Sequence, residues 1–130
     1  MLKLRALPLL LALTSAACNG GPTAISTARI RVSKVSDGIR LENLTDQRRG
    51  YFLVDQNVTP LIDWAPCTTT TPDCLRLPAH GTVTVKFSDI TGYSASSTKS
   101  VVVYNWSVVD NGNGSASVDL DTPAVVIKLD

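Results

Sequence analysis

The sequence predicts an all-β protein, an antiparallel β-sandwich of about seven or eight strands that follows an N-terminal signal segment. Short stretches in which apolar and polar residues alternate recur through residues 27–130. Turn-forming Gly, Asn, Asp and Pro residues separate these stretches every several positions. After residue 18, no window of helical length keeps an apolar residue at every third or fourth position. Many short strands without helices are typical of two sheets that bury one face each.

Residues 1–17 have the three parts of a secretory signal peptide. Lys3 and Arg5 form a basic head, residues 6–13 are apolar apart from one proline, and small residues lead to Cys18. The apolar run is much shorter than the roughly 20 residues that cross a bilayer as a helix. We therefore expect residues 1–17 to be removed, so that the mature chain begins at Cys18.

The segment Ser15-Ala16-Ala17-Cys18 resembles the lipobox of bacterial lipoproteins, in which the cysteine is acylated, commonly with palmitate, and becomes the mature N-terminus. This resemblance implies a cell-envelope protein held by lipid on Cys18, at the periplasmic face or the outer membrane. Asn19 is not the aspartate that favours inner-membrane retention, so the outer membrane is the favoured site. However, Ser15 stands where leucine is usual, and the segment also suits an ordinary signal peptidase. A secreted protein with an unmodified Cys18 is the alternative.

The mature chain is expected to carry almost no net charge. Residues 1–17 hold two of the 12 basic residues and none of the 11 acidic residues, which leaves a net charge of −1. A near-neutral domain without a basic block lacks the electrostatic footprint of nucleic-acid-binding proteins. It also lacks the lysine-rich patch that binds anionic lipids, so attachment to a membrane is expected from acyl chains on Cys18.

The other two cysteines, Cys67 and Cys74, are expected to form a disulfide in an oxidising compartment. Residues 68–73 separate them, and closing so short a loop contributes about 2.5 kcal/mol in the chain-entropy model. The alternative is a metal site, but two thiols and the single His80 fall short of the four ligands that zinc requires. No metal or other cofactor is therefore expected.

A tether and three strands are expected in the first part of the mature chain. Residues 18–26 contain Gly, Pro, Ser and Thr with few apolar residues, as flexible linkers do. Alternation predicts strands over 30–35 and 39–42. Residues 47–50 are a polar, basic turn, and residues 51–54 are an apolar run of strand formers too short for a helix. The sandwich domain is thus assigned to residues 27–130.

The middle of the chain is expected to be partly irregular. A proline interrupts the extended piece over 58–64, which is therefore an edge strand or irregular. Residues 82–87 alternate cleanly and predict a strand. In the following loop, residues 88–99, Ile90 and Tyr93 are the expected packing residues.

The strongest strand signal covers residues 101–109. One face of this strand is wholly apolar, so its Trp106 is expected in the core; the face consists of Val102, Tyr104, Trp106 and Val108. Two Asn-Gly steps in 111–114 predict a tight hairpin turn. Residues 116–120 and 125–129 are the last predicted strands.

Two stretches resemble elements of immunoglobulin-like envelope domains. Residues 38–43 contain a predicted strand followed by Asn43, and residues 77–85 carry a Leu-Pro-x-x-Gly-Thr element. The Gly92-Tyr93 step and the late Val/Tyr/Trp strand look like those of small bacterial lipoproteins. The resemblance covers most of the mature chain and implies an immunoglobulin-like β-sandwich. Cys67 and Cys74 are too close in sequence to join opposite sheets as antibody-domain cysteines do.

No catalytic motif is evident, and the protein is expected not to be an enzyme. His80 stands between Ala and Gly in a predicted turn, where an exposed side chain is expected rather than a general base. Asp119 and Asp121 would share a strand face, and solvated carboxylates explain them best. Residues 110–114 faintly resemble a calcium loop, but they lack its final glutamate and are better explained as the hairpin turn.

Two functions fit these observations. The first is a non-catalytic, membrane-anchored envelope lipoprotein that contacts another envelope protein or supports an assembly. The second is a small-ligand or glycan-binding module with exposed aromatic residues, the candidates being Trp64, Tyr51 and Tyr93. The sequence holds only two Trp, three Tyr and two Phe residues, nearly all of which a sandwich core can absorb, and this favours the first function.

The disulfide loop is the expected contact surface of the first function. Trp64 would be its aromatic anchor, and the residues expected to project into solvent are Thr68, Thr69, Thr70 and Thr71. A bridge restricts the loop, which lowers the entropy lost on meeting a partner. The alternative is that the bridge only pins an irregular crossover between the two sheets.

Overall fold

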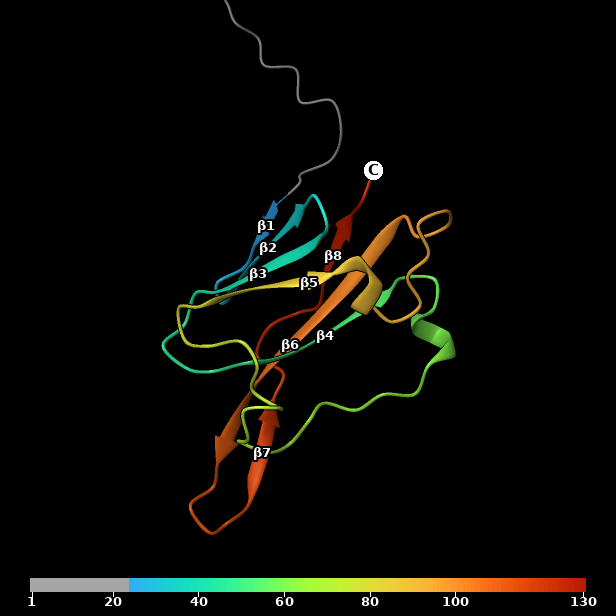
Figure 1. Ribbon diagram of the computed structural model, residues 1–130. Helices are drawn as coiled ribbons and strands as arrows, with labels where there is room; N and C mark the ends of the chain where they lie inside the picture. Colours follow the sequence, from blue (N-terminus) through green and yellow to red (C-terminus); the bar gives the residue numbers. More distant parts are fainter. Residues whose placement is uncertain (1–23) are drawn as a thin grey trace, which may run out of the picture.

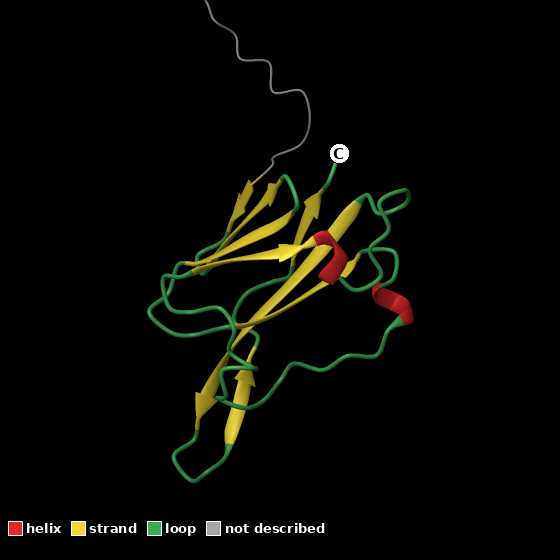
Figure 2. Ribbon diagram, viewed as in Figure 1, coloured by secondary structure: helices red, strands yellow, loops and turns green. Residues whose placement is uncertain are grey.

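Within residues 24–130, eight strands form two antiparallel sheets that pack face to face, which confirms the predicted all-β sandwich (Figures 1 and 2). A computed structural model describes residues 24–130 of the chain. Cys18 and the signal segment 1–17 lie outside the described residues. Within residues 24–130, no helix is long and apolar enough to cross a membrane.

The first sheet has the strand order β1-β2-β3-β5, and all of its pairs are antiparallel. Its strands are β1 (Ala24–Ser26), β2 (Ile30–Val35), β3 (Gly38–Asn43) and β5 (Thr82–Lys86). β1 covers residues that the sequence assigns to the tether, 18–26. They join the sheet because Ile25 packs against the hydrophobic core and pairs with Val32 of β2. The first sheet therefore includes Ala24–Ser26, three residues that the sequence assigns to the tether.

The second sheet is built around one long strand, β6. Its members are β4 (Gly50–Asp55), β6 (Ser100–Asp110), β7 (Ala116–Asp119) and β8 (Val125–Lys128). β4 pairs with one side of β6, whereas β8 and β7 pair with the first and second halves of the other side. Two short 3-10 helices, η1 (Thr59–Leu61) and η2 (Phe87–Asp89), lie in the connections.

The connections cross between the sheets in an interlocked order. β3 pairs with β5 although β4 separates them in sequence, and β4 pairs with β6 although β5 separates them. This exchange is the one that joins strands B, C, E and F of immunoglobulin-like sandwiches. In that correspondence, β3, β4, β5, β6 and β8 take the places of strands B, C, E, F and G.

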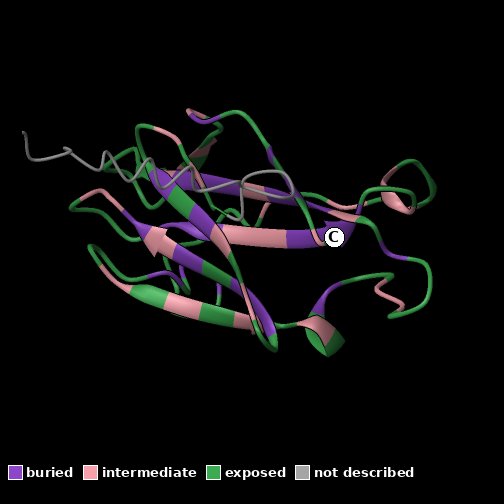
Figure 3. Ribbon diagram, turned by 90° about the horizontal axis from the view of Figure 1, so that it is seen from above, coloured by how far each residue is buried: buried purple, intermediate pink, exposed green. Residues whose placement is uncertain are grey.

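The main hydrophobic core lies between the sheets. Its buried residues include Ile30, Val32, Ile39, Leu41, Leu53, Leu77, Ile90, Val101, Val103, Val125 and Ile127. Ile90 and Tyr93 pack as the sequence predicts, the first buried and the second partly buried. The buried stretches lie mostly on the strands, whereas the loops around them are mostly exposed (Figure 3).

The core-facing side of β6 is the opposite of the predicted one. Val101 and Val103 face the core, so the face that carries Tyr104 and Trp106 points out of the sandwich. Trp106 is nevertheless buried, with 3% of its surface exposed. Its burial is explained by the connection between β4 and β5, which crosses this outer face.

Candidate functional site

An aromatic cluster covers the outer face of the second sheet. Trp64, from the irregular connection after η1, stacks on Phe52 of β4 with ring centroids 4.8 Å apart. The same indole lies 4.6 Å from the ring of Tyr104 and 5.9 Å from that of Trp106, both on β6. Aromatic pairs at such separations add to the stability gained by burial. Trp64 thus attaches the connection to the sheet.

The predicted disulfide between Cys67 and Cys74 is present, with Cα atoms 5.5 Å apart. Cys74 is buried and Cys67 is exposed, so one end of the bridge is fixed in the fold. The Trp106 indole Nε1–H donates a hydrogen bond to the Cys67 carbonyl oxygen at 3.1 Å. The loop is therefore closed covalently and also held to β6 by a hydrogen bond.

The four threonines of this loop all lie on the surface. The hydroxyls of Thr69 and Thr71 are hydrogen-bonded to each other at 2.8 Å. A shallow depression of about 250 Å³ separates the loop from the β6–β7 hairpin, and its lining residues are Thr68, Thr69, Thr70, Asp110, Gly114, Ser115 and Ala116. We call the four threonines together with residues 110–116 the threonine–hairpin surface.

This surface lies at the end of the domain that is remote from Ala24. In Figure 1 the β6–β7 hairpin projects from the lower end of the sandwich, beside the disulfide loop, whereas β1 begins near the upper end. The hairpin turn itself is closed by Asn111 N–H, which donates to the Ser115 carbonyl at 2.9 Å. The hydrogen bonds within the turn favour the hairpin explanation of residues 110–114 over a calcium loop.

Two of the three aromatic candidates for ligand binding come together, and the third does not. Tyr51 and Trp64 line a small pocket of about 210 Å³, and Arg76 and Asp73 line it as well. The Arg76 guanidinium lies over the Tyr51 ring, 4.4 Å from its centroid. Tyr93 instead stacks on Phe87 and lines a different depression.

A buried ion-pair network joins the β3–β4 turn to the chain after β7. Arg49 is 1% exposed, and its Nη2 donates to Asp121 Oδ1 at 2.6 Å and to Asn105 Oδ1 at 2.9 Å. Arg29 approaches the other carboxylate oxygen at 3.2 Å. Burial raises the pKa of Asp121, but the hydrogen bond and charge of Arg49, the charge of Arg29 and the Thr122 hydroxyl outweigh it and leave the pKa below its ordinary 3.8.

This network corrects one expectation from the sequence, that of a solvated Asp121. Arg49, from the predicted polar turn 47–50, is buried, because it bonds to Asp121 and Asn105 inside the fold. Asp121 is not a solvated carboxylate of β7, since that strand ends at Asp119 and the Asp121 side chain is only 13% exposed. The pairing of Asp121 with the buried Arg49 indicates a structural role.

The remaining sequence candidates are exposed. His80 is exposed, and Asp119 is exposed near the end of β7. Among residues 24–130, no three His, Cys, Asp or Glu side chains are placed to hold a metal ion together. The structure thus brings together Trp64, the disulfide and the threonines, and leaves the titratable candidates apart.

Two features of the site have no local signal in the sequence. The β6–β7 hairpin is predictable, but its position beside the threonines depends on the path of the non-periodic connection 56–81. Arg76 also joins Tyr51 only through that path. Sequence patterns with a period of two report the faces of strands and do not report where an irregular crossover lies.

Comparison of the chain with protein-family models, curated proteins and solved structures found no match.

Proposed function

We propose that the protein is a non-catalytic, lipid-anchored module of the bacterial cell envelope that binds another envelope protein through the threonine–hairpin surface. The signal-like segment ending at Cys18 supplies the anchor in this proposal. Cys18 precedes Ala24 by six residues, so the lipid would hold the domain by the end at which β1 begins. The threonine–hairpin surface would then face away from the membrane.

One observation carries this proposal: the disulfide loop is held in place at its base, while its threonine side chains are exposed. The bridge, the Trp106–Cys67 hydrogen bond and the stacking of Trp64 fix the base of the loop, while its threonines stay accessible. A surface that is ordered before binding loses less conformational entropy on meeting a partner. In this arrangement Trp64 positions the loop from below instead of inserting into the partner.

Site-specific photo-crosslinking in cells tests the proposal. A photoreactive amino acid at Thr70 or Ser115, both on the threonine–hairpin surface, should give the same crosslinked envelope protein. A matched control at Arg40, which is exposed on the first sheet, should not give it. Equal crosslinking from all three positions, or none from Thr70 and Ser115, would contradict the proposal.

Glycan or small-ligand binding is a second candidate, and the pocket between Tyr51 and Trp64 is the observation that favours it. Ligand sites usually measure about 300–1,000 Å³. The pocket has about 210 Å³, which places this candidate second. Titration with soluble oligosaccharides should change the fluorescence of Trp64 if this candidate is right, and Tyr51→Ala should abolish the change.

A further inference from the structure

Two edge strands lie on the same side of the sandwich, and Leu77 and Thr91 bridge both ends of the β4 edge but leave the β5 edge open. β5 ends the first sheet and β4 ends the second. In Figure 3, β5 forms the outer edge of the molecule, and exposed and half-buried residues alternate along it. Constant-type immunoglobulin domains have a further strand, D, beside the strand that corresponds to β5. Here the connection 56–81 first crosses the outer face of the other sheet and then returns past the β4 edge, where Leu77 bridges Arg49, and no strand among the described residues takes the place of strand D.

The free edge of β5 presents a row of main-chain groups. The Phe87 N–H donates to the Asp37 carbonyl at 3.0 Å, so the odd-numbered residues of this segment bond to β3. Because an antiparallel ladder alternates, the N–H and C=O groups of Thr82, Thr84 and Lys86 point away from β3. They have no hydrogen-bond partner within residues 24–130.

The sequence of β5 does little to protect this edge. Natural sheet edges are usually blocked by prolines, bulges or charges. The segment Thr82–Lys86 contains no proline or glycine, its register with β3 is regular, and Lys86 is its one charged residue. A regular edge of this kind is suited to accept an added strand.

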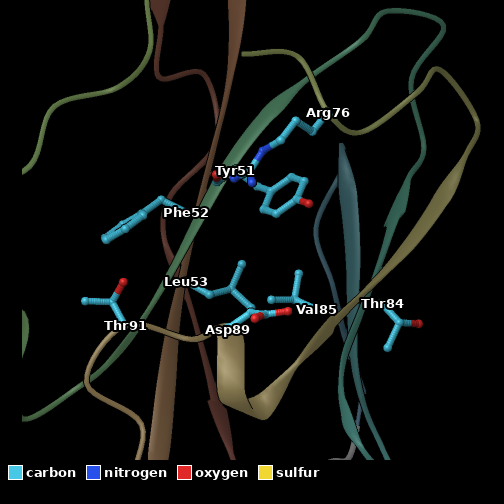
Figure 4. A pocket seen from close by; sticks show the side chains of 8 residues that line it. All are labelled: Tyr51, Phe52, Leu53, Arg76, Thr84, Val85, Asp89 and Thr91. Atoms are coloured by element: carbon cyan, nitrogen blue, oxygen red, sulfur yellow. Dashed lines mark hydrogen bonds between the residues drawn. The ribbon is translucent and has the colours of Figure 1, made fainter. Parts of the chain in front are cut away.

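A groove of about 360 Å³ separates this edge from β4 (Figure 4). Arg76 and Tyr51 lie at one end of it, Asp89 lies toward the other, and Leu53 and Val85 line the middle. The Arg76 side chain donates to the Tyr51 carbonyl at 3.1 Å. Arg76 and Asp89 form no ion pair with any described residue. The groove therefore has a cationic end and an anionic end.

β4 adds donors on its side of the groove. Arg49 and Leu77 exchange two backbone hydrogen bonds at 3.0 Å. The N–H and C=O groups of the odd-numbered residues of β4 therefore point away from β6. The N–H groups of Tyr51 and Leu53 consequently point toward the groove and find no partner within residues 24–130.

We propose that the free edge of β5 binds an extended segment of a partner protein, which adds to the first sheet as an antiparallel strand. Alternating N–H and C=O groups match a repeating backbone, and antiparallel pairing is slightly more stable than parallel pairing. The chain runs from Arg76 into β5 and from β5 to Asp89, so an antiparallel segment has its C-terminal side beside Arg76. The recognised segment is therefore basic at its N-terminal side and acidic at its C-terminal side, and β-branched residues between them suit an extended strand.

A second copy of the chain is disfavoured as the occupant by strand direction. β1 starts at Ala24, and the successive antiparallel pairs make β1 and β5 antiparallel, so the N-terminal end of β1 points toward the Lys86 end of β5. Two copies paired through β5 would have tethers at opposite ends of the joined sheet. Two chains anchored through Cys18 in one membrane could not adopt that arrangement, a step that rests on the anchor in the proposed function.

The groove and the threonine–hairpin surface share no residue. The β5 edge belongs to the first sheet, whereas the disulfide loop is held on the outer face of the second. Loss of binding at one surface therefore leaves the other in place, and the two proposals can fail separately.

The first test uses the full-length, detergent-extracted protein and an end-capped fluorescent peptide, Lys-Thr-Val-Thr-Val-Thr-Glu. With its central threonine opposite Thr84, its lysine lies toward Asp89 and its glutamate toward Arg76. Fluorescence anisotropy should show saturable binding. The charge-reversed peptide Glu-Thr-Val-Thr-Val-Thr-Lys should bind about three- to tenfold more weakly, because attractive exposed pairs become repulsive ones.

The second test blocks the edge. Thr84→Pro removes an N–H that faces away from β3, so the β3–β5 ladder can remain intact while docking weakens about tenfold or more. Thr84→Ala is the matched control because it keeps the N–H, and its binding should stay within about twofold of wild type. Circular dichroism checks that both variants are folded.

A third measurement leaves the protein unchanged and so does not depend on the folding of a variant. N-methylation of the central threonine of the peptide removes the N–H that would donate to Thr84 and should weaken binding about tenfold. Equal binding of methylated and unmethylated peptides, no saturable binding, or preference for the charge-reversed peptide would overturn the proposal. Self-association of the wild-type protein that Thr84→Pro abolishes would overturn it too, since a second copy would then occupy the edge.

Discussion

The indole of Trp106 lies over Gly50, its cross-strand partner in the second sheet: a Cβ atom on Gly50 would come within 2.4 Å of the indole. A glycine weakens a strand unless its surface is covered, and the large aromatic ring covers it here. Since Trp106 also donates a hydrogen bond to Cys67, the same side chain links β4, β6 and the disulfide loop.

Gly50→Ala should therefore destabilise the domain by about 1–3 kcal/mol, because the added methyl group forces the indole from its position. Thermal or urea unfolding would measure the loss. In a Trp106→Leu background the methyl group has room, so the additional cost of Gly50→Ala should largely disappear. A cost that is equal in both backgrounds would show that the two residues do not interact.

Trp106→Ala should lower the free energy of unfolding by about 3–5 kcal/mol through lost burial and the cavity left behind. Such a loss is a large part of the stability of a small domain. The disulfide loop should also lose its hydrogen bond to β6 and become more sensitive to proteases. A variant that melts like wild type would contradict the buried position of this side chain.

The sequence identifies β6 and the burial of Trp106 but assigns the wrong face to the core. Both faces of the first half of β6 are apolar, with Val101 and Val103 on one side and Val102 and Tyr104 on the other. Alternation with a period of two cannot tell which apolar face meets the other sheet. The irregular connection after β4 covers the second face, and its path leaves no periodic signal.

The ion pair of Arg49 and Asp121 predicts how stability depends on pH. The pKa of Asp121 is lower in the folded state than in the unfolded chain, so its contribution is complete above about pH 4 and is lost as pH falls through the folded pKa. Asp121→Asn should cost about 3–5 kcal/mol near pH 7, because Arg49 then stays buried without its carboxylate. The gap between the two unfolding free energies should narrow as pH falls below about 4. A gap that is constant down to pH 2 would contradict the pairing.

Sequence patterns could not predict this pair. Arg49 and Asp121 are separated by 72 positions, and each stands among polar residues that suit a solvated turn. Their proximity depends on the packing of the β3–β4 turn against the chain after β7. The strands themselves are predictable because each carries a local alternation, whereas contacts between turns depend on the assembled fold.

Removal of the disulfide should have a modest thermodynamic effect and a clear spectroscopic one. Replacing Cys67 and Cys74 together with serine should cost about 2.5 kcal/mol in the chain-entropy model, since the loop closed by the bridge is short. The loop covers the Trp106 side of the sheet, so tryptophan fluorescence should shift as water reaches the cluster. Unchanged fluorescence with unchanged stability would show that Trp64 and Trp106 hold the loop without the bridge.

The lipid anchor is tested by mass. Intact mass spectrometry of the protein extracted from membranes should show a chain that starts at Cys18 and carries an acyl adduct, because Ser15-Ala16-Ala17-Cys18 resembles a lipobox. Cys18→Ser should release the protein from the membrane fraction without changing its unfolding temperature. A soluble wild-type species with an unmodified Cys18 would instead support plain secretion.

Replacement of Thr68, Thr69, Thr70 and Thr71 with alanine separates a binding surface from a structural clip. All four side chains are exposed, and the replacements leave the disulfide, Trp64 and the Trp106–Cys67 hydrogen bond in place. Stability should therefore change by less than about 0.5 kcal/mol per residue. If the threonine–hairpin surface binds an envelope protein, crosslinking from Ser115 to that protein should fall sharply in this variant. Full crosslinking with unchanged stability would leave the bridge as a clip that pins the crossover to the outer face of β6, and the partner contact would then have to lie elsewhere on the domain.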